Sequence, residues 1–273
     1  MQNPISHWQQ ERMIELNTND FLTVSPLFKG IEHNESLVFS VIEGNSPGRV
    51  FVDRLDAPAS VYLLHEGAFH FVGGSAVNDC FNQALVSLIF DDVLSSSEEQ
   101  ELVLFAFSEI WRETLDALLS HHGAIRIRRK TFAFNPTGFQ ACGDWRGQIP
   151  EGFHIRHVDK KLAEKHVVYR PLIEAGSQRF GTCLMKGDEI ISVCQAVCVG
   201  GGKAEIDIHT EEIHQRQGYA FLTACAFIEE CLQRNLTPSW SCWPEREASC
   251  VLAKKLGFEE MPDIPAHYWM ADM

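Results

Sequence analysis

The segment from Thr210 to Ala220 has the residue types and spacing best suited to chemistry in this 273-residue chain. Gly218 and Ala220 stand where an alternating, strand-like pattern gives way to a long helical one. Small side chains at a helix start let backbone N–H groups approach a ligand, and those unpaired groups carry partial positive charge. The segment therefore predicts an anion site suited to a pyrophosphate. It has neither the GxxxxGK[ST] nor the GxGxxG pattern of other nucleotide sites.

The elements that must position this loop can be predicted from hydrophobic periodicity. Residues 203–210 alternate strictly, with Ala and Ile on one face and Glu, Asp and His on the other. A helix is expected from the loop to about residue 234, then a strand at 238–243 and a helix at 247–256. Further strands are expected at 153–158, 181–185 and 190–199, with a helix from about residue 160. This alternation predicts an α/β (α+β) domain.

Two motifs in this region resemble a known family. Gln215, Gly218 and Ala220 match the Q/R-x-x-G-x-G/A motif of the GNAT acyltransferase superfamily, in the right strand–loop–helix context. The segment 249–258, which ends in KLGF, resembles the helix that closes most such domains. The strand before it, flanked by Cys and Trp, is similar to the two-lobed zwittermicin-resistance-type branch. The resemblance covers residues 151–273 and implies a mixed sheet flanked by helices.

The resemblance also implies a cofactor: acetyl-CoA or another acyl-CoA as co-substrate, and no metal. The pyrophosphate would lie on the N–H groups of the motif loop, and the pantetheine arm would run along the end of the preceding strand. The cofactor-binding residues expected from this match are Ile208, His209, Thr210, Gln215, Arg216, Gln217, Gly218, Tyr219, Ala220 and Ser249.

The implied reaction is direct attack of an amine on the thioester in a ternary complex. An amine with a pKa near about 10.4 is protonated at neutral pH and must first lose a proton. A base, or a water chain leading to one, serves this step. The chain departs from the family here, because Ala204 falls where histone-type members carry a glutamate base. Ala253 falls where many members carry a tyrosine acid, and Arg246 replaces a common asparagine.

Substitutes for the missing base and acid can be named. Glu205, Asp207 and His209 are candidate bases; alternation places them on the face opposite Ala204, and a bulge in the strand would reverse that face downstream. The alternative is that these three residues have structural roles only. Ser249 and Cys250 are candidate acids. We take Glu205, Asp207 and Ser249 as the candidate catalytic residues.

The net charge and the composition of the chain limit the classes of molecule that it is expected to bind and the compartment it is expected to occupy. The chain has 23 Lys and Arg against 37 Asp and Glu, a formal charge of −14. Such a chain would repel a phosphate backbone, so nucleic acid is not expected, whereas a cationic amine acceptor would be attracted. Nine cysteines without a CxxC pair suit a reducing compartment and not a zinc site. With no signal-like N-terminus and no apolar run of about 18 residues, we expect a soluble, cytoplasmic protein without a membrane segment.

Gly and Pro cluster between residues 135 and 152, which predicts a boundary between an N-terminal accessory lobe, 1–150, and an acyl-CoA-binding domain, 151–273. The first lobe is expected to have strands at 49–53, 59–64 and 68–72 and a helix at 98–119, capped by a serine at 95–97. This order loosely repeats that of the second lobe but lacks the motif. It is either a degenerate GNAT-like copy that forms one wall of the acceptor site or an unrelated α/β cap.

Three functions compete. The first is an acyl-CoA-dependent N-acyltransferase acting on a small-molecule or peptide amine. The second is a catalytically silent acyl-CoA sensor or scaffold, which the residues at Ala204, Arg246 and Ala253 would suit. The third is a protein-interaction domain without CoA.

Overall fold

A computed structural model of the chain describes residues 13–65, 69–96, 100–165, 172 and 178–271. They form two compact units, each made of separate chain segments. The first unit takes in the residues up to Ile31, then Gly48–Ile127 and those from Ala266 on. The second takes in Glu32–Pro47 and Arg128–Pro265. This division differs from the predicted boundary at 150, because residues 32–47 and 128–150 pack with the second unit.

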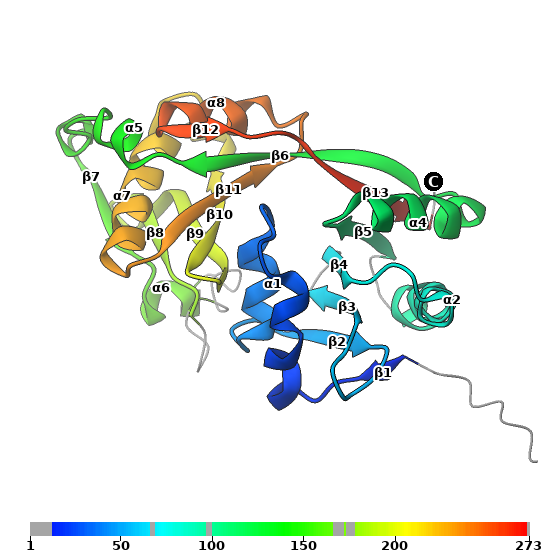
Figure 1. The fold of residues 1–273 in the computed structure, drawn as a ribbon. Helices are drawn as coiled ribbons and strands as arrows, with labels where there is room; N and C mark the ends of the chain where they lie inside the picture. The colour runs from blue at the N-terminus through cyan, green and yellow to red at the C-terminus, as the bar shows by residue number, and fades with distance from the viewer. Residues whose placement is uncertain (1–12, 66–68, 97–99, 166–171, 173–177, 272–273) are drawn as a thin grey trace, which may run out of the picture. The chain divides into compact units, whose positions relative to one another are not determined.

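The first unit is a mixed sheet with helices (Figure 1). Its strands, in spatial order, are β1 (Ile14–Glu15), β2 (Gly48–Val52), β3 (Ser60–His65), β4 (Phe69–Gly74), β5 (Glu101–Ala106) and β13 (Ile264–Met270). Neighbours are antiparallel except β4 and β5, which are parallel. Its helical elements are η1 (Thr18–Phe28), α2 (Asp79–Ser87), η2 (Leu88–Val93), α3 (Leu94–Ser96), α4 (Glu109–Leu119) and η3 (Ser120–His122).

The second unit has the same strand order and directions. Its strands, in spatial order, are β7 (Phe153–His157), β8 (Gly181–Lys186), β9 (Glu189–Gly200), β10 (Lys203–Thr210), β11 (Thr237–Cys242) and β6 (Ile125–Phe134), with β12 (Phe258–Glu260) also paired to β6. Here β10 and β11 are the parallel pair. Its helical elements are α1 (Glu35–Ile42), α5 (Pro136–Gln140), η4 (Arg146–Gln148), α6 (Lys160–Lys165), η6 (Glu212–His214), α7 (Tyr219–Gln233) and α8 (Glu247–Lys255).

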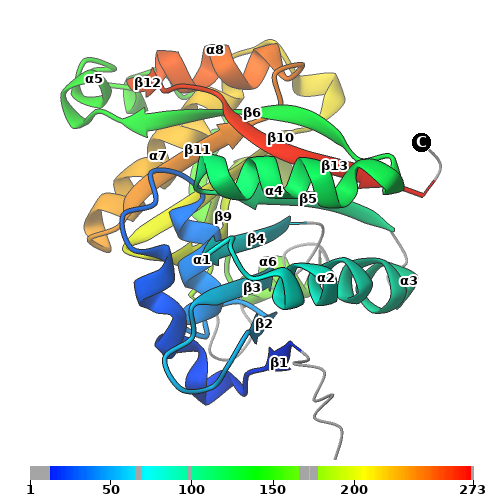
Figure 2. The same cartoon turned by 45° about the vertical axis from the view of Figure 1, so that its right-hand side comes forward.

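The last strand in each sheet comes from a distant part of the sequence. In the first unit β13 pairs with β5 from Ala266 to Met270, although about 160 residues separate them. In the second unit β6 pairs with β11. Figure 2 shows α4 beside β5 and β13. The predicted α/β fold with a mixed sheet flanked by helices is therefore confirmed.

The core of the second unit lies between its sheet and α7. Buried α7 side chains recur at helical spacing, so that one stripe of the helix covers the sheet. These residues are Phe221, Leu222, Ala224, Cys225, Phe227, Ile228 and Cys231. Helix α1 packs closely on β9, since a Cβ added at Gly200 would lie 2.1 Å from the Ser40 backbone nitrogen. A glycine is therefore needed where helix and strand meet.

One predicted element of the first unit is wrong. Residues 98–119 do not form a single helix: Glu101–Ala106 is strand β5, and helix α4 begins only at Glu109. The cap is Ser108, whose Oγ accepts a hydrogen bond from the Trp111 N–H at 3.2 Å, and not a serine at 95–97. The spacing of Leu102 and Phe105 suits a helix, but both lie on a fully buried strand, which needs no alternation.

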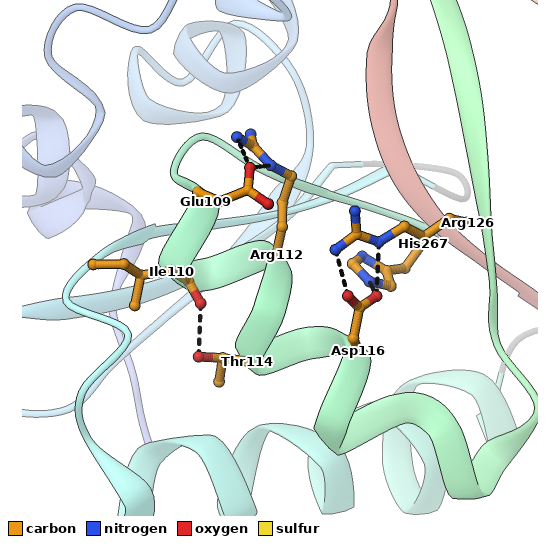
Figure 3. Close-up of polar contacts among 7 residues, drawn as sticks. All are labelled: Glu109, Ile110, Arg112, Thr114, Asp116, Arg126 and His267. Atoms are coloured by element: carbon orange, nitrogen blue, oxygen red, sulfur yellow. Dashed lines mark hydrogen bonds and ion pairs between the residues drawn. The ribbon is translucent and has the colours of Figure 1, made fainter.

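A polar cluster within the first unit joins α4 to Arg126, at the start of β6, and to His267 of β13 (Figure 3). The Asp116 carboxylate accepts a hydrogen bond from Arg126 Nε at 2.7 Å and lies 2.9 Å from Nε2 of the buried His267. Burial lowers the pKa of His267, and the Asp116 carboxylate opposes this shift.

None of the helices in the described ranges has both the length and the apolar character that a membrane-spanning helix needs.

Candidate active site

The motif loop joins β10 to α7 through two residues with left-handed backbone. Gly218, the residue before α7, has φ +85°, and Arg216 has φ +63°. Among the described residues, the chain neighbours of Gly218 aside, no atom lies within 4 Å of the position a Cβ would take there, so the backbone faces open space. The first N–H groups of α7 have no partner within the helix. Gly218 and Ala220 thus lie at the start of α7, beside N–H groups that have no partner within the helix.

Side-chain amides hold this loop against β10. Gln215 Nε2 donates to the Thr210 carbonyl at 3.2 Å, and Gln217 Nε2 donates to the Ile213 carbonyl at 3.4 Å. The Tyr219 ring packs on Phe153, with ring centroids 5.1 Å apart. The motif glutamine thus shapes the loop through its side chain. Arg216 lies exposed on the same loop.

The pairing of β10 with β11 ends at Glu205, five residues before β10 ends at Thr210. Their parallel register covers Lys203, Ala204 and Glu205, which pair with Thr237, Pro238 and Ser239. The register does not extend to Ile208, His209 and Thr210, where the pantetheine arm was predicted. On its other side β10 stays paired with β9 as far as Thr210, whose Oγ1 lies 2.9 Å from Ser192 Oγ.

The faces of β10 follow the predicted alternation. The register with β9 shifts between Glu205 and Ile206, because β9 has one extra residue, Val197. The bulge is thus in β9, and β10 is not reversed as the alternative expectation allowed. Ala204 and Ile206 lie in the core with α7, and Glu205 lies on the opposite face.

Glu205 is buried, with 4% of its surface exposed, and both carboxylate oxygens accept hydrogen bonds. Ser36 Oγ donates to Oε2 at 2.8 Å, and Ser241 Oγ donates to Oε1 at 2.5 Å. Arg129 Nε in turn donates to Ser241 Oγ at 3.1 Å, and its guanidinium lies 4.8 Å from the ring centroid of Trp243. Burial lowers the pKa of Arg129, and the Glu205 charge opposes this. An arginine remains a cation at neutral pH.

The other two candidate bases differ from Glu205 in exposure. Asp207 is exposed, and its carboxylate accepts a hydrogen bond from Gln195 Nε2 at 3.1 Å. His209 is also exposed, with Nε2 3.8 Å from Glu211 Oε1. Of the three, Glu205 alone is buried beside the point where β10 and β11 part.

Ser249 and Cys250, the candidate acids, lie at the start of α8. Ser249 Oγ accepts a hydrogen bond from Nε1 of the buried Trp240 at 3.0 Å, so its own O–H can donate. Trp240 and Ser241 are consecutive on β11 and point to opposite faces. Ser249 and Glu205 therefore lie on opposite sides of this strand. Cys250 Sγ lies 3.5 Å from Cys242 Sγ, and burial raises the pKa of Cys242 to about 11.

The two alanines that stand where a base and an acid were sought are structural in this chain. Ala204 and Ala253 are fully buried in the core of the second unit. Ser36, Ser241 and Arg129 were not found from the sequence, because a serine in a helix or strand gives no distinct pattern. Among the described residues, no group of three or more His, Cys, Asp or Glu side chains could hold a metal ion.

Comparison with known proteins shows which family has this fold and this loop. The sequence model of the GNAT acetyltransferase family matches residues 25–265, most of the chain. The chain therefore belongs to the GNAT acetyltransferase family and is an acetyltransferase, as its motifs predicted. Members of this family use acetyl-CoA as co-substrate.

Three relatives illustrate the match. The chain is 25% identical over 263 residues to the uncharacterized N-acetyltransferase YdfB of Bacillus subtilis, covering 93% of this chain and 97% of the relative. A GCN5-related N-acetyltransferase-like protein from Streptococcus suis has the same fold, with TM-score 0.67 and 21% identity over 92% of this chain and 98% of that one. A tandem GNAT protein from the clavulanic acid biosynthesis pathway gives TM-score 0.64 and 11% identity, over 96% and 99% of the two chains.

Proposed function

We propose that this chain transfers the acetyl group of acetyl-CoA directly to an amine, and that its second unit performs the transfer. The observation that carries the proposal is the position of Glu205. It is a buried carboxylate beside the point where β10 and β11 part, on the strand that leads into the Gly218 loop. One strand thus supplies both a candidate base and the approach to an anion site.

The cofactor would be held by backbone groups and one cation. The N–H groups of Gly218, Tyr219 and Ala220 would bind the pyrophosphate at the start of α7. Arg216 would add positive charge against the overall charge of −14. The free edge of β10 from Ile208 to Thr210 would bind the pantetheine arm as a further strand would. The loop side chains of Gln215 and Gln217 would keep this backbone in place.

The chemistry divides between the two faces of β11. Glu205 would accept the proton that the attacking ammonium must lose, directly or through water. Ser249, on the opposite face, would donate a proton to the departing thiolate. Asp207 is the alternative base; its carboxylate is exposed and accepts a hydrogen bond from Gln195.

The first unit would be a degenerate copy that does not bind CoA. Its strand order repeats that of the second unit. The end of β4, which corresponds to the end of β10, is already filled: Trp111 Nε1 donates to the Gly74 carbonyl at 3.0 Å. A Cβ on Gly73 would lie 2.8 Å from the Phe28 ring. The Trp111 side chain thus takes the Gly74 carbonyl, one of the backbone groups that a pantetheine arm would need there.

The acceptor would be a cationic amine, a small molecule or a peptide. The net charge of −14 creates a field that raises the association rate of cations. Residues 1–150 carry 10 basic and 19 acidic side chains, and residues 151–273 carry 13 and 18, so the more negative part is the first. Nine free thiols suit the cytoplasm as the place where the reaction occurs.

Ala204 and Ala253 are core residues that offer neither base nor acid, so amine-dependent turnover through another base is the property to test. The test incubates the protein with acetyl-CoA and a panel of amines (spermidine, lysine, an aminoglycoside and a peptide with a free N-terminus) while free thiol is followed. We expect amine-dependent thiol release from the wild type. In E205Q we expect kcat to fall by about 100-fold or more, with the KM for acetyl-CoA nearly unchanged.

Results other than these would assign the base differently or contradict the proposal. If D207N and not E205Q loses activity, Asp207 is the base. Calorimetric binding of acetyl-CoA without thiol release from any amine would contradict transfer to an amine. The absence of any thermal shift with acetyl-CoA would contradict the proposed cofactor site.

A further inference from the structure

Helix α1 belongs to the second unit although it precedes most of the first unit in the sequence. Its backbone lies directly on Gly200 of β9. Lys203 Nζ lies 2.5 Å from Glu35 Oε2, the Gly201 N–H donates to Glu43 Oε1 at 3.1 Å, and Asn45 Nδ2 donates to the Val199 carbonyl at 3.1 Å. Both ends of α1 are therefore fastened to the turn between β9 and β10.

Two serines on α1 differ in what their hydroxyls do. Ser36 and Ser40 are one turn apart and both fully buried. Ser40 Oγ donates to the Leu37 carbonyl at 2.9 Å, the local bond that serines in helices commonly make. Ser36 Oγ instead donates to Glu205 Oε2 at 2.8 Å, across the packing interface. The Ser36 hydroxyl is thus directed at the carboxylate.

Hydrogen bonds to both oxygens fix the orientation of the Glu205 carboxylate. Arg129 Nε donates to Ser241 Oγ, so the Ser241 hydroxyl has its proton available for Glu205 Oε1. Ser36 fixes the other oxygen. Each carboxylate oxygen has two lone pairs, so each can still accept a proton from a substrate amine. Rates of proton transfer depend steeply on such placement, because an error of about 1 Å can cost about 100-fold.

We propose that Ser36 is a positioning residue for the Glu205 carboxylate, so that the upstream segment 32–47 is part of the acetyl-transfer site of the second unit. This inference rests on the proposed function, in which Glu205 is the base. Ser36 itself does not touch the reacting atoms; it acts through the orientation of Glu205.

The test compares S36A, S36T and S40A, using acetyl-CoA and whichever amine of the panel is turned over fastest. In S36A we expect kcat to fall by about tenfold, a part of what a general base contributes, with the KM for acetyl-CoA within about twofold of wild type. S36T keeps the hydroxyl and should recover most of the rate. S40A removes a hydroxyl of equal burial that does not contact Glu205, and should keep the wild-type kcat.

A second measurement does not depend on turnover. In protein labelled with ¹³C at the glutamate carboxyl, the Glu205 resonance, assigned by its loss in E205Q, should move in S36A and not in S40A. The proposal is overturned if S36A and S40A have the same kcat, or if both leave that resonance unchanged. If the proposed function itself is wrong, the result is different: the wild-type protein binds acetyl-CoA but releases no thiol with any amine.

Discussion

Gly218 and Gly143 both have a left-handed backbone conformation. Comparing substitutions at the two positions distinguishes the backbone strain that any other residue would cause from the loss of space for a ligand. Their φ angles are +85° and +66°, and at both, apart from the chain neighbours, no atom of the described part of the chain lies within 4 Å of the position a Cβ would take. A residue other than glycine is strained at both sites. Only Gly218 lies immediately before the helix that would bind the cofactor.

We expect G218A and G143A each to lower the free energy of unfolding by about 1 kcal/mol. Only the Gly218 variants should weaken acetyl-CoA binding: G218A moderately, and G218W completely, because the indole would occupy the space meant for the pyrophosphate. Isothermal titration calorimetry with acetyl-CoA and urea unfolding measure the two effects. Retained affinity in G218W would contradict the placement of the cofactor.

At the scale of elements, the cluster of Asp116, Arg126 and His267 fastens α4 to β6 and β13 (Figure 3). Its importance comes from burial, since His267 is 4% exposed and would lose the partner of its Nε2 without Asp116. A second pair on the same helix, Glu109 and Arg112, lies at the surface. Surface pairs contribute little to stability.

We therefore expect D116A to lower the free energy of unfolding by about 1–2 kcal/mol at pH 7.5, and E109A by less than about 0.5 kcal/mol. The D116A deficit should grow as the pH falls below about 6.5, where His267 becomes protonated in the unfolded chain. Burial already lowers the pKa of His267 in the fold, and D116A removes the carboxylate that opposes this shift. Urea unfolding of both variants at pH 7.5 and 5.5 measures these losses of stability. If D116A and E109A lost the same free energy at both pH values, the stabilising role of the Asp116 cluster would be contradicted.

The elements also show how far the sequence could predict the site. The change from alternating to helical spacing predicted the loop, and the alternation of 203–210 predicted the faces of β10, because both signals are local. The motif at Gln215, Gly218 and Ala220 is a family resemblance and implied what the loop binds. The contacts of Ser36 with Glu205 and of β13 with β5 join residues more than 150 positions apart. Such pairings leave no local pattern. The same limit made the buried strand β5 look like part of a helix.

For the whole molecule, the exchange of segments between the units decides how the chain can be divided. The fragment 151–273 would lack α1, β6 and three side chains of its own unit's core, Phe132, Phe139 and Trp145. It contains β13, which pairs with β5 of the other unit. A cut at 150 therefore removes core residues from both units.

We expect the fragment 151–273 alone to unfold without a cooperative urea transition, and co-expression with 1–150 to restore both the transition and thiol release. Circular dichroism and the thiol assay measure these outcomes, with the intact chain as the control. A cooperative fragment 151–273 that binds acetyl-CoA on its own would show that the exchanged segments are dispensable.

The pairing of β13 with β5 also imposes an order on synthesis. The ribosome completes residues 128–265, nearly all of the second unit, before it makes Ala266–Met270. Until then β5 has an unpaired edge in the nascent first unit, even though that unit's other strands were made first. Exposed edges of this kind promote mispairing with other chains. The unit whose synthesis begins first therefore receives its last strand after every residue of the second unit has been made.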